Sequence, residues 1–549
     1  MKLVYQGNEI GLTHENESAL DMFGEHIDSS ADKIIACRCN NEIRPLDYKF
    51  SDGDNVELID LKDNDGMKVY IRGVLYLMAM AFHELYPNAL LVINYQLFNA
   101  MFCELDNMKV TDEMLQNVKN RMIEISRENI PIVKKEMTKE EAHEFYSKER
   151  TLRGILQLEN PLKDEVSLYF CKDYFNYFYG VMPVSTKYIN LFEIEKHKNG
   201  FIVRYPDKHN PSVVGDFKDN RKFLAALQEY DDIFEVMGIR TTYKVNKLIE
   251  EGKAKDLILM SEALHEKKIA QIADKILKKP GVRLILIAGP SSSGKTTFAK
   301  RLGMQLRVNG LKPVTIGTDN YFVERVDNPK DENGEYDFET IDALDLDLFN
   351  DHLTKLINGE TINVPTFDFK EGTKKYYPEK TMHLSKDEVL VIEGIHCLNN
   401  KLTASIPKDE KFKIYISDLT VLNIDYFNRI STTDTRLVRR IVRDYNYRGY
   451  SALETLKRWP SVNAGERKNI FPFQEEADVM YNSSLVYEHN ILGRYAIPLL
   501  DAIPNTEREY SEAKRLSSFL KYFTPIENEN IIPNNSLLRE FIGGSVFDY

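Results

Sequence analysis

The residues best suited to chemistry lie in one short stretch near the middle of the chain, Gly289–Thr296. Its spacing, with Gly289 followed by Gly294-Lys295-Thr296, fits G-x-x-x-x-G-K-[ST], a loop whose backbone N–H groups surround phosphate oxygens. Lys295 would reach the β- and γ-phosphates of a nucleoside triphosphate, and the Thr296 hydroxyl would bind Mg²⁺. The residues predicted to hold ATP or GTP are Gly289, Ser291, Ser292, Ser293, Gly294, Lys295, Thr296 and Thr297.

The sequence on both sides of this loop favours phosphate binding over an accidental match in a serine-rich turn. Before the loop, the apolar run Val282–Ala288 predicts a buried parallel strand. After it, Phe298, Leu302 and Leu306 recur at helical spacing, and Asn309-Gly310 predicts the end of that helix. An anion-binding loop requires this order, because the helix N-terminus adds partial positive charge at the phosphates.

Two further predicted strands end in carboxylates. Asp319 follows the run Pro313–Gly317, and Glu393 closes the apolar run Val389–Ile392. Ligands of doubly wound sheets lie outside the carboxyl ends of the strands, so both carboxylates should face the phosphate-binding loop. Asp319 is a candidate catalytic base for an attacking hydroxyl, and capping the next turn is its alternative role. Glu393 and Thr296 are the candidate Mg²⁺ ligands, since Mg²⁺ takes only one or two carboxylates.

A helix rich in arginine is predicted over Asp434–Asp444. Its arginines recur every three or four residues and share one broad face: Arg436, Arg439, Arg440 and Arg443. Such a cluster is either a solvated basic face or a lid whose guanidinium groups stabilise charge on a transferring phosphoryl group. We predict the lid, with a flexible turn at its end formed by Tyr447-Arg448-Gly449.

Composition limits the class of protein. A chain of 549 residues is too long for one domain, and its net charge of −13 provides no overall basic field. Five cysteines predict no disulfide framework, and no CxxC or HxxxH pair is present for a metal. Neither a signal peptide nor a membrane-spanning apolar run is evident. We expect a cytoplasmic protein with small-molecule partners and no membrane. A homo-oligomer is compatible with the sequence, and nucleic acid is disfavoured although tRNA stays open.

Changes in periodicity divide the chain into segments with different expected folds. The expected boundaries are a small, mostly β unit over 1–62, an α+β region over 63–240, a helical connector over 241–280, an α/β domain with a parallel sheet over 281–505, and a C-terminal helix and tail over 506–549. Within the connector, the charged run around His265 is expected to be a solvated surface. The last segment is expected to be helical through Lys521.

The first two segments resemble the editing half of threonyl-tRNA synthetases, a β-grasp-like TGS domain followed by the second additional domain. The resemblance lies in Pro45-Leu46-Asp47-Tyr48, in 84–89 and in Pro183-Val184-Ser185-Thr186. That family carries an HxxxH pair and a CxxxH pair in its pocket. Here Arg72 and Tyr76 take the place of the first pair, and Phe175 follows Cys171 where a histidine belongs. A deacylase built on those side chains is therefore not expected.

Residues 283–490 resemble the uridine kinase and phosphoribulokinase family. The matching blocks, in order, are Gly289–Thr296, Thr318–Phe322, Tyr336–Phe338 with Ile341–Asp345, Val364–Phe369, Ile392–Ile395, Asp434–Asp444 and Ala477–Val479. The resemblance implies Asp319 as the base, Asp342 as the ligand of ribose hydroxyls, and Tyr321 and Phe367 as walls of a nucleoside pocket. It also implies that Arg436 and Arg439 act on the phosphates, with Arg440 and Arg448 as further substrate-binding candidates.

Two departures leave the acceptor open. Uridine kinases usually carry Tyr at the position of Phe367 and a His shortly afterwards, where this chain has 370–374. Lost polar contacts to a base change discrimination strongly. We predict a kinase that transfers the γ-phosphate of Mg·ATP or Mg·GTP to a nucleoside 5′-hydroxyl, most simply that of uridine or cytidine. The alternatives are a kinase of another sugar, such as a phosphorylated pentose, and an RNA-binding regulator that uses nucleotide as a switch.

Overall fold

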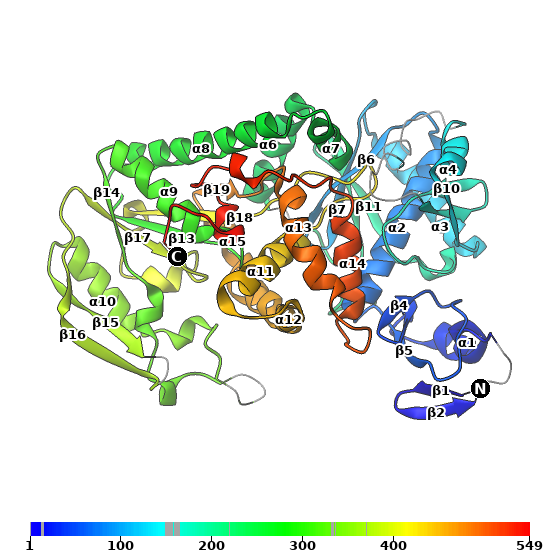
Figure 1. Cartoon of the computed structure of the whole chain (residues 1–549), viewed down its shortest axis with the longest axis horizontal. Helices are drawn as coiled ribbons and strands as arrows, with labels where there is room; N and C mark the ends of the chain where they lie inside the picture. Colours follow the sequence, from blue (N-terminus) through cyan, green and yellow to red (C-terminus); the bar gives the residue numbers. More distant parts are fainter. Residues whose placement is uncertain are drawn as a thin grey trace.

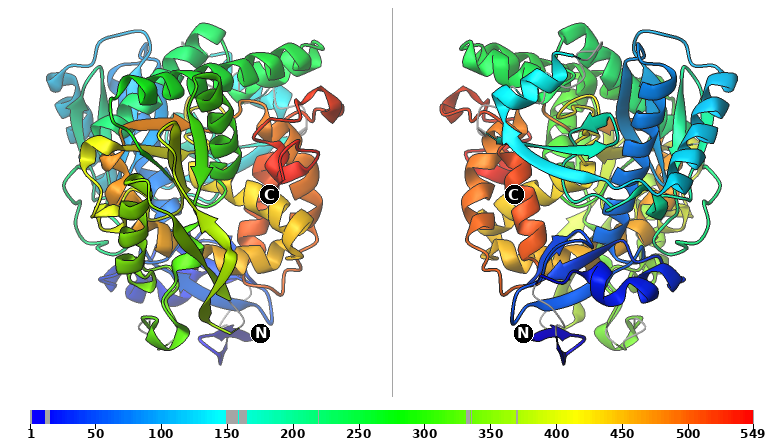
Figure 2. Two further views of the ribbon diagram at one scale, coloured as in Figure 1. Left: turned by 90° about the vertical axis from the view of Figure 1, so that its left-hand side faces the viewer. Right: turned by 90° about the vertical axis from the view of Figure 1, so that its right-hand side faces the viewer.

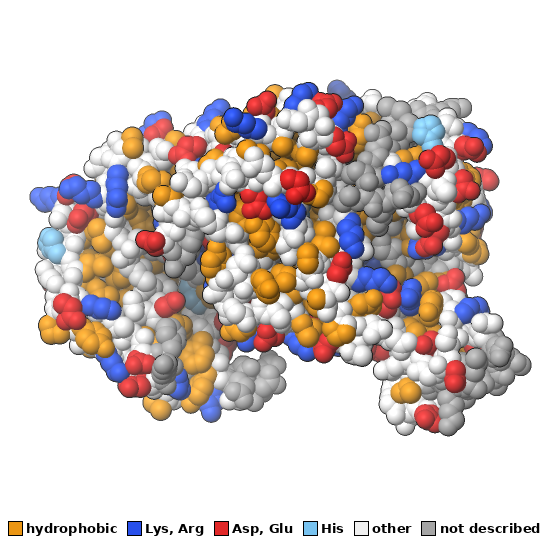
Figure 3. Space-filling model, in the orientation of Figure 1, with side chains coloured by type: hydrophobic (Ala, Val, Ile, Leu, Met, Phe, Trp, Pro, Cys, Tyr) orange, Lys and Arg blue, Asp and Glu red, His pale blue; other side chains and the backbone are white. Residues whose placement is uncertain are grey.

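The computed structural model describes residues 2–11, 16–148, 158, 165–218, 220–330, 334, 336–368 and 371–548. It is an elongated molecule with the N-terminal strands at one end, a parallel sheet at the other and a long helix along one side (Figure 1). Acidic and basic side chains are interspersed over the face shown in Figure 3. Among the described helices, none combines the length and apolarity needed to cross a bilayer.

The first unit is a mixed sheet covered by one helix. Its elements are β1 (Lys2–Tyr5), β2 (Asn8–Gly11), α1 (Ala19–Ser29), β3 (Ala36–Cys39), β4 (Glu42–Arg44) and β5 (Asn55–Ile59). The strands lie in the order β2-β1-β5-β3-β4, and only β1 and β5 pair in parallel. Ala19 and Ile27 of α1 pack against the sheet at Cys37 and Val56, which closes a small core.

The second region combines one long buried helix with two antiparallel sheets. Its elements are α2 (Asn64–Leu85), β6 (Leu91–Leu97), β7 (Ala100–Leu105), α3 (Asp112–Glu128), β8 (Val133–Thr138), α4 (Lys139–Tyr146), β9 (Glu165–Cys171), β10 (Tyr174–Asn176), β11 (Glu193–His197) and β12 (Gly200–Arg204). The sheets have the orders β10-β9-β8 and β11-β12-β7-β6. Helix α2 begins at a cap formed by Asp63.

The aromatic stretch 169–179 supplies core side chains, as its composition favours. Tyr169, Tyr174 and Phe178 are buried against α2 in one apolar cluster. The hydroxyl of Tyr76 donates a hydrogen bond to the Tyr169 carbonyl, so this tyrosine is also fixed inside the protein. These rings therefore pack the interior and do not form an exposed base-stacking surface.

Three helices connect the two halves: α6 (Arg221–Met237), α7 (Thr242–Glu250) and α8 (Ala254–Lys278). The expectation of a solvated surface at His265 is wrong. His265 is only 1% exposed, and its Nε2 lies 2.9 Å from the Ser484 carbonyl oxygen. Burial lowers the pKa of His265 to about 3. The charged sequence was misleading because α8 buries one stripe against the parallel sheet through Ile269 and Ile272.

The C-terminal half is built on a wholly parallel sheet, as predicted. Its strands are β13 (Leu284–Ala288), β14 (Lys312–Thr315), β17 (Glu388–Glu393), β18 (Lys411–Ser417) and β19 (Val479–Asn482), in the order β14-β17-β13-β18-β19. β13 is buried on both faces because its side chains alternate between two cores. Ile285 and Ile287 pack toward α8 and α9 (Lys295–Val308), and Leu284 and Leu286 pack toward α10 (Leu346–Ile357).

A hairpin of β15 (Ile362–Asp368) and β16 (Thr373–Met382) projects from this sheet (Figure 2). The remaining helices are α11 (Thr432–Arg448), α12 (Ala452–Asn469), α13 (Glu488–Asp501), α14 (Tyr510–Leu520) and α15 (Arg539–Ile542). Beyond α14 the chain turns back, so that its C-terminal end lies beside α9 and β13 (Figure 1). Phe541 is fully buried, which shows that this tail is part of the core.

The two halves are joined by main-chain hydrogen bonds as well as by packing. After β18, the chain reaches the sheet of the second region, where the Ile93 N–H donates to the Tyr426 carbonyl at 2.8 Å. The Thr242 N–H donates to the Asn423 carbonyl at 2.7 Å. At the other end, α14 contacts β4, and the Ile43 N–H donates to the Ser511 hydroxyl.

Candidate phosphate-binding active site

The predicted phosphate-binding loop joins β13 to α9, and the helix begins at Lys295 as predicted. Ser292 and Gly294 both have positive φ, 58° and 82°, which turns the backbone inward. A Cβ at Gly289 would lie 2.0 Å from the Ile416 carbonyl oxygen, so only glycine fits there. The side-chain oxygens of Ser292 and Ser293 are buried without a hydrogen-bond partner. These donors and the start of α9 fit the phosphates of a nucleotide.

The Lys295 side chain lies within the phosphate-binding loop. Its Nζ donates to the carbonyl oxygens of Gly289 and Pro290, at 2.9 and 3.0 Å. Burial lowers the pKa of Lys295, and nearby carboxylates, with Glu393 first among them, oppose that shift. Lys295 is therefore a cation held on weak neutral partners beside the place where phosphate would bind.

The two predicted Mg²⁺ ligands meet. Thr296 Oγ1 donates to Glu393 Oε1 at 3.2 Å, although the residues are far apart in sequence. The other oxygen of Glu393 is buried without a partner, and burial raises the pKa of this carboxyl. An unsatisfied carboxylate oxygen next to a hydroxyl fits a hard cation that takes its remaining ligands from phosphate and water. Thr296 and Glu393 would hold Mg²⁺ here.

Arg436 of α11 contacts the phosphate-binding loop through a main-chain carbonyl and is almost wholly buried. Its guanidinium binds both oxygens of Glu466 on α12, at 2.6 and 2.9 Å, and donates to the Ser291 carbonyl at 3.2 Å. The same carboxylate accepts the Ser291 N–H at 2.8 Å. Trp459 lies against the guanidinium, with 5.5 Å between Arg436 Cζ and the ring centroid. Arg436 and Glu466 therefore fix the conformation of the loop.

Arg439 is fully buried in a second carboxylate pair. Its Nε lies 2.6 Å from Glu488 Oε2, and its Nη2 donates to the Ser483 carbonyl. Nη1 donates to the Ser292 carbonyl of the loop at 3.3 Å. A solvated basic face is thus excluded for these arginines, because α11 turns them into the protein. In this conformation both contact the back of the loop and not an open phosphate site.

The remaining arginines of α11 surround Asp444. Arg440 donates through Nε to this carboxylate at 3.2 Å and through Nη1 to the Ser291 hydroxyl at 2.8 Å. Arg443 pairs with Asp444 at 2.8 Å, and Arg448 lies at the more exposed end of the helix, 3.7 Å from Asp444. Gly449 then ends α11 with φ of 69°, which confirms the predicted turn.

Asp319 lies at the edge of the sheet that carries the phosphate loop. It follows β14 in a short 3₁₀ turn and is exposed. The neighbouring Thr318 contacts the turn after β17, with its Oγ1 3.3 Å from the Cβ position at Gly394. Asp342 is also exposed and lies close enough to His396, beyond the same turn, to influence its pKa. The carboxyl ends of β14, β17 and β13 thus gather Asp319, Glu393 and the loop.

The two predicted aromatic residues of the acceptor pocket have different environments. Tyr321 is wholly buried, and its hydroxyl is hydrogen-bonded to His352 Nδ1 at 2.9 Å. This differs from the pocket-lining position that the resemblance implies, because the 3₁₀ turn points the ring into the core. Phe367 packs on Phe322, and Phe322 packs on Phe338, with ring centroids 5.5 and 5.9 Å apart. Phe338 is 37% exposed, so this cluster opens to solvent.

Residues that sequence reasoning missed contact the loop from distant helices. Glu466 is one, and Glu540 of α15 is the other. Glu540 Oε2 accepts a hydrogen bond from Thr297 Oγ1 at 2.5 Å and from the Thr297 N–H at 3.4 Å. Leu537 lies against Gly294, where a Cβ would meet its side chain at 2.4 Å. A carboxylate therefore accepts one of the N–H groups at the anion-binding start of α9. No local sequence pattern predicts this contact.

Comparison with known proteins identifies the C-terminal half. The model of the phosphoribulokinase / uridine kinase family matches residues 284–486. A uridine kinase of Mycoplasma genitalium is 31% identical over 182 residues, which cover 33% of this chain and 75% of that protein. A uridine kinase of Ureaplasma urealyticum is 28% identical over 215 residues, 39% of this chain and 93% of that protein.

One solved structure, described as a possible uridine kinase from Bacillus stearothermophilus, is similar at 19% identity over 39% of this chain and 98% of its own, with a TM-score of 0.26. The match to the family model lies within the C-terminal half, and the resemblance of the N-terminal half to a synthetase stays a prediction. On its sequence match to the uridine kinases, together with the strand–loop–helix and the Thr296–Glu393 pair, this chain belongs to the phosphoribulokinase / uridine kinase family and is an ATP-dependent kinase.

Proposed function

We propose that this protein transfers the γ-phosphate of Mg·ATP to the 5′-hydroxyl of a nucleoside, with uridine or cytidine as the first candidates. The observation that carries the proposal is the Thr296–Glu393 pair beside the phosphate loop, with Asp319 exposed at the same edge of the sheet. We expect an acceptor hydroxyl bound at Asp319 to face the terminal phosphate, because both lie at the carboxyl ends of the strands. GTP is the alternative donor.

Each side chain has a separate role in this reaction. Lys295 would leave the carbonyls of the loop and bind the β- and γ-phosphates. Asp319 accepts the proton of the attacking hydroxyl, and Asp342 orients the sugar. Mg²⁺, held by Thr296 and Glu393, would neutralise charge on the phosphates. Arg436 and Arg439 keep the loop in shape, and a direct action on the phosphates would require α11 to move.

The acceptor would lie against the aromatic rings that follow Asp319 in the chain. The packed side chains Phe322, Phe338 and Phe367 form an apolar wall, which suits the face of a base. A phosphorylated pentose would instead need cations at this position. Phe367 has no hydroxyl for a base edge, and the neighbouring positions Phe369 and Lys370 lie outside the described residues. The preferred base is therefore the part of the proposal that experiment must decide first.

The N-terminal half is proposed to be a synthetase-like appendage without editing chemistry. Of the side chains at the former editing positions, Tyr76 is committed to the Tyr169 carbonyl. Burial raises the pKa of the Cys171 thiol to about 12, so it stays protonated. Phe175 packs among other rings. A cytoplasmic location and a possible homo-oligomer belong to the same proposal.

The proposal is tested with a nucleoside panel and Mg·ATP, measuring ADP release for uridine, cytidine, adenosine, guanosine and a pentose phosphate. Asp319→Asn should lower kcat by about 10²–10⁴-fold, because it removes the base and preserves shape. Lys295→Ala should lower kcat/KM by about 10²-fold or more, because a preorganised positive charge is lost.

Asp327→Asn is the matched control, because Asp327 is an exposed aspartate in the following 3₁₀ turn. It should retain full turnover, and all three variants should keep the melting temperature of the parent. Full activity of Asp319→Asn would refute the assignment of the base. Filter binding with tRNA addresses the regulatory alternative: tight binding without turnover of any nucleoside would replace the kinase proposal.

A further inference from the structure

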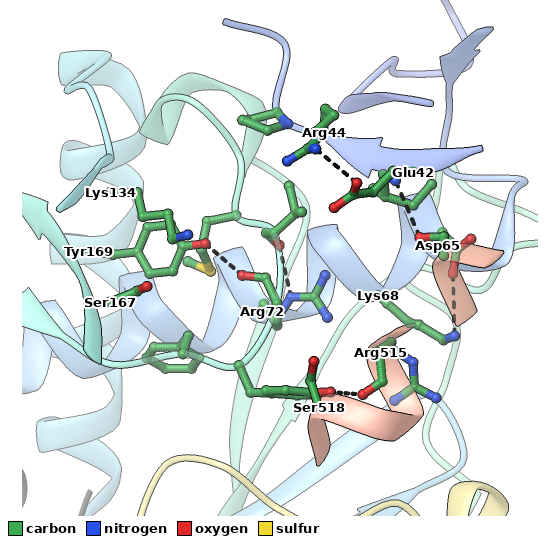
Figure 4. Close-up of a pocket in the computed structure, with 18 of the residues that line it drawn as sticks. Glu42, Arg44, Asp65, Lys68, Arg72, Lys134, Ser167, Tyr169, Arg515 and Ser518 are labelled. Carbon is green, nitrogen blue, oxygen red and sulfur yellow. Dashed lines mark hydrogen bonds and ion pairs between the residues drawn. The ribbon is translucent and has the colours of Figure 1, made fainter. Parts of the chain in front are cut away.

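A cavity lies where the two halves of the chain meet, and no residue of the phosphate loop lines it. Its volume is about 500 Å³, in the range of small-molecule sites. It is surrounded by β4, α2, the strands β8 and β9, and α14 (Figure 4). None of the residues to which we assign kinase chemistry lines it. The cavity is therefore independent of the site described above.

Arg72 of α2 points into this cavity and differs from the other cations there. Only its Nε is engaged, donating to the Val181 carbonyl at 2.9 Å. Among the described residues, no carboxylate pairs with Arg72. Burial lowers the pKa of Arg72 to about 10, which still leaves it protonated at neutral pH. Arg72 is partly buried, and a cation with restricted access to water and no counter-ion is unfavourable, so a bound anion would offset this.

The glycine at position 180 leaves space for the Arg72 guanidinium. Gly180 has φ of 107°, and a Cβ there would lie 2.9 Å from Cζ and Nη1 of Arg72. The hydroxyl of Tyr169 donates to the Gly180 carbonyl at 2.6 Å, which holds the loop in place. The terminal nitrogens of Arg72 therefore face the cavity from a fixed position, as a carboxylate or phosphate site requires.

The other cations of the cavity are already neutralised. Lys68 pairs with Asp65 and Glu512, at 3.3 and 3.1 Å. Arg515 pairs with Glu512 and, through a bidentate contact at 2.7 Å, with Asp434 of α11. The remaining positive side chains have partners at 2.7 or 2.8 Å: Arg44 and Lys514 on Glu42, and Lys134 on Glu136.

The rest of the lining is largely aromatic and apolar. Buried side chains of Tyr169, Tyr177, Phe178 and Met182 form one wall, and Tyr522 lies on the side of α14. A purely inorganic ion would leave this surface uncovered. The lining suits a molecule with one negative group and an apolar body.

We propose that this cavity binds a small organic anion, with its carboxylate or phosphate on Arg72 and its apolar body against the aromatic wall. Carboxylate and phosphate share the chemistry that a guanidinium recognises. The proposal does not depend on the acceptor of the kinase reaction.

Three probes with one aromatic ring test the proposal on the full-length protein: benzoate, phenyl phosphate and the neutral benzamide. Binding is measured by saturation-transfer NMR titration, with dissociation constants of about 1–10 mM expected for ligands of this size. We expect at least one anion to bind and benzamide not to bind. Binding of benzoate alone identifies a carboxylate site, and binding of phenyl phosphate alone identifies a phosphate site. Equal binding of benzamide, or no binding of either anion, would overturn the proposal.

Substitutions at and away from the cavity show where the anion binds. Arg72→Gln should weaken the anion by about tenfold or more, because a charged hydrogen bond is lost. Arg72→Lys should retain part of the affinity, and Arg508→Gln, at an exposed arginine, should retain all of it. Titrating phenyl phosphate into Lys295→Ala separates this site from the phosphate loop: binding that depends on Lys295 and not on Arg72 contradicts the proposal.

A second variant covers the outcome that Arg72→Gln does not fold. Ser518 of α14 lines the opposite side of the cavity (Figure 4), and Ser518→Trp should fill the space for the apolar body. This variant should abolish anion binding while the kinase reaction continues. Unchanged anion binding in Ser518→Trp would place the ligand elsewhere and end the proposal.

Discussion

Arg436 and Arg439 of α11 are buried and paired with carboxylates, whereas Arg72 of α2 is partly buried and has no carboxylate partner among the described residues. Arg436 and Arg439 bind Glu466 and Glu488 and use their remaining donors on the phosphate loop. Arg72 donates to one carbonyl. The comparison separates two uses of a buried cation: a paired arginine stabilises and positions its surroundings, whereas an unpaired one leaves a charge for a ligand.

The largest effect is expected from Arg439→Met. It would leave Glu488 buried without its partner, so we expect a loss of about 3–5 kcal/mol of stability. Thermal unfolding measures the loss. The double variant Arg439→Met/Glu488→Gln should recover part of it, because the stranded charge is removed as well. If Arg439→Met proved as stable as the parent, the arginines of α11 would not differ from Arg72.

Arg436→Met should cost somewhat less stability, about 2–4 kcal/mol, and should also raise KM for ATP. Without Arg436, the carboxylate of Glu466 stays beside the Ser291 N–H and repels phosphate. Steady-state kinetics distinguish this from direct catalysis. A positioning role changes mainly KM, whereas a fall in kcat at saturating ATP would mean that Arg436 acts on the transferring phosphate.

Three charged side chains that line the cavity form ion pairs and can be compared with the unpaired Arg72: Lys68, Glu512 and Arg515. Burial would raise the pKa of Glu512, but Arg515 and Lys68 outweigh it and hold the pKa well below its ordinary value. A depressed carboxyl pKa stabilises the fold above the unfolded-state pKa of about 4.3, and this stabilisation is lost as pH falls further.

Glu512→Gln should therefore lower stability at neutral pH by about 1–2 kcal/mol, since the set is partly exposed. It should also weaken the dependence of melting temperature on pH below about 4. Melting curves from neutral to acidic pH test both effects. A parallel decline of parent and variant would show that this set contributes nothing to acid stability.

Glu540 tests whether a carboxylate competes with phosphate at the loop. Glu540→Gln removes the negative charge near the Thr297 N–H, so an ATP analogue should bind about three- to tenfold more tightly, roughly 1 kcal/mol. Isothermal titration calorimetry measures the change. Glu527→Gln, at an exposed glutamate before α15, is the control and should leave affinity unchanged. Weaker binding in Glu540→Gln would make Glu540 part of the nucleotide site and not its competitor.

Arg72→Gln is expected to have the smallest effect, and of opposite sign. Removing a cation without a counter-ion should leave stability unchanged or raise it by up to about 1 kcal/mol. The same thermal unfolding assay applies. A loss as large as that of Arg439→Met would mean that Arg72 has a structural partner.

Local patterns identified the phosphate loop. The apolar strand, the glycines and the helical spacing after Lys295 lie within one continuous stretch, so their geometry follows from neighbouring residues. The meeting of Thr296 with Glu393 was also predictable, because parallel strands end at the same edge of a sheet. The position of Asp319 at this edge of the sheet was predictable for the same reason.

The side chains that distant helices bring to the phosphate loop and to the arginines of α11 could not be predicted from the sequence. The spacing of Arg436 and Arg439 indicated a shared face but not that the face is buried, since the sequence does not say which carboxylates α12 and α13 bring. His265 was misjudged for the same reason: charged neighbours concealed a contact with Ser484. Glu540 is more distant still, because α15 reaches the loop only through the return of the C-terminal tail.

By itself the sequence determined a strand, an anion-binding loop and a helix, along with the parallel sheet that aligns Glu393 with Thr296. It did so because these features depend on periodicity, on glycine conformations and on the direction of strands. Only the tertiary structure decided which charges are neutralised. Pairing depends on which distant side chains packing brings within a few ångströms, and that is why Arg439 has a carboxylate and Arg72 does not.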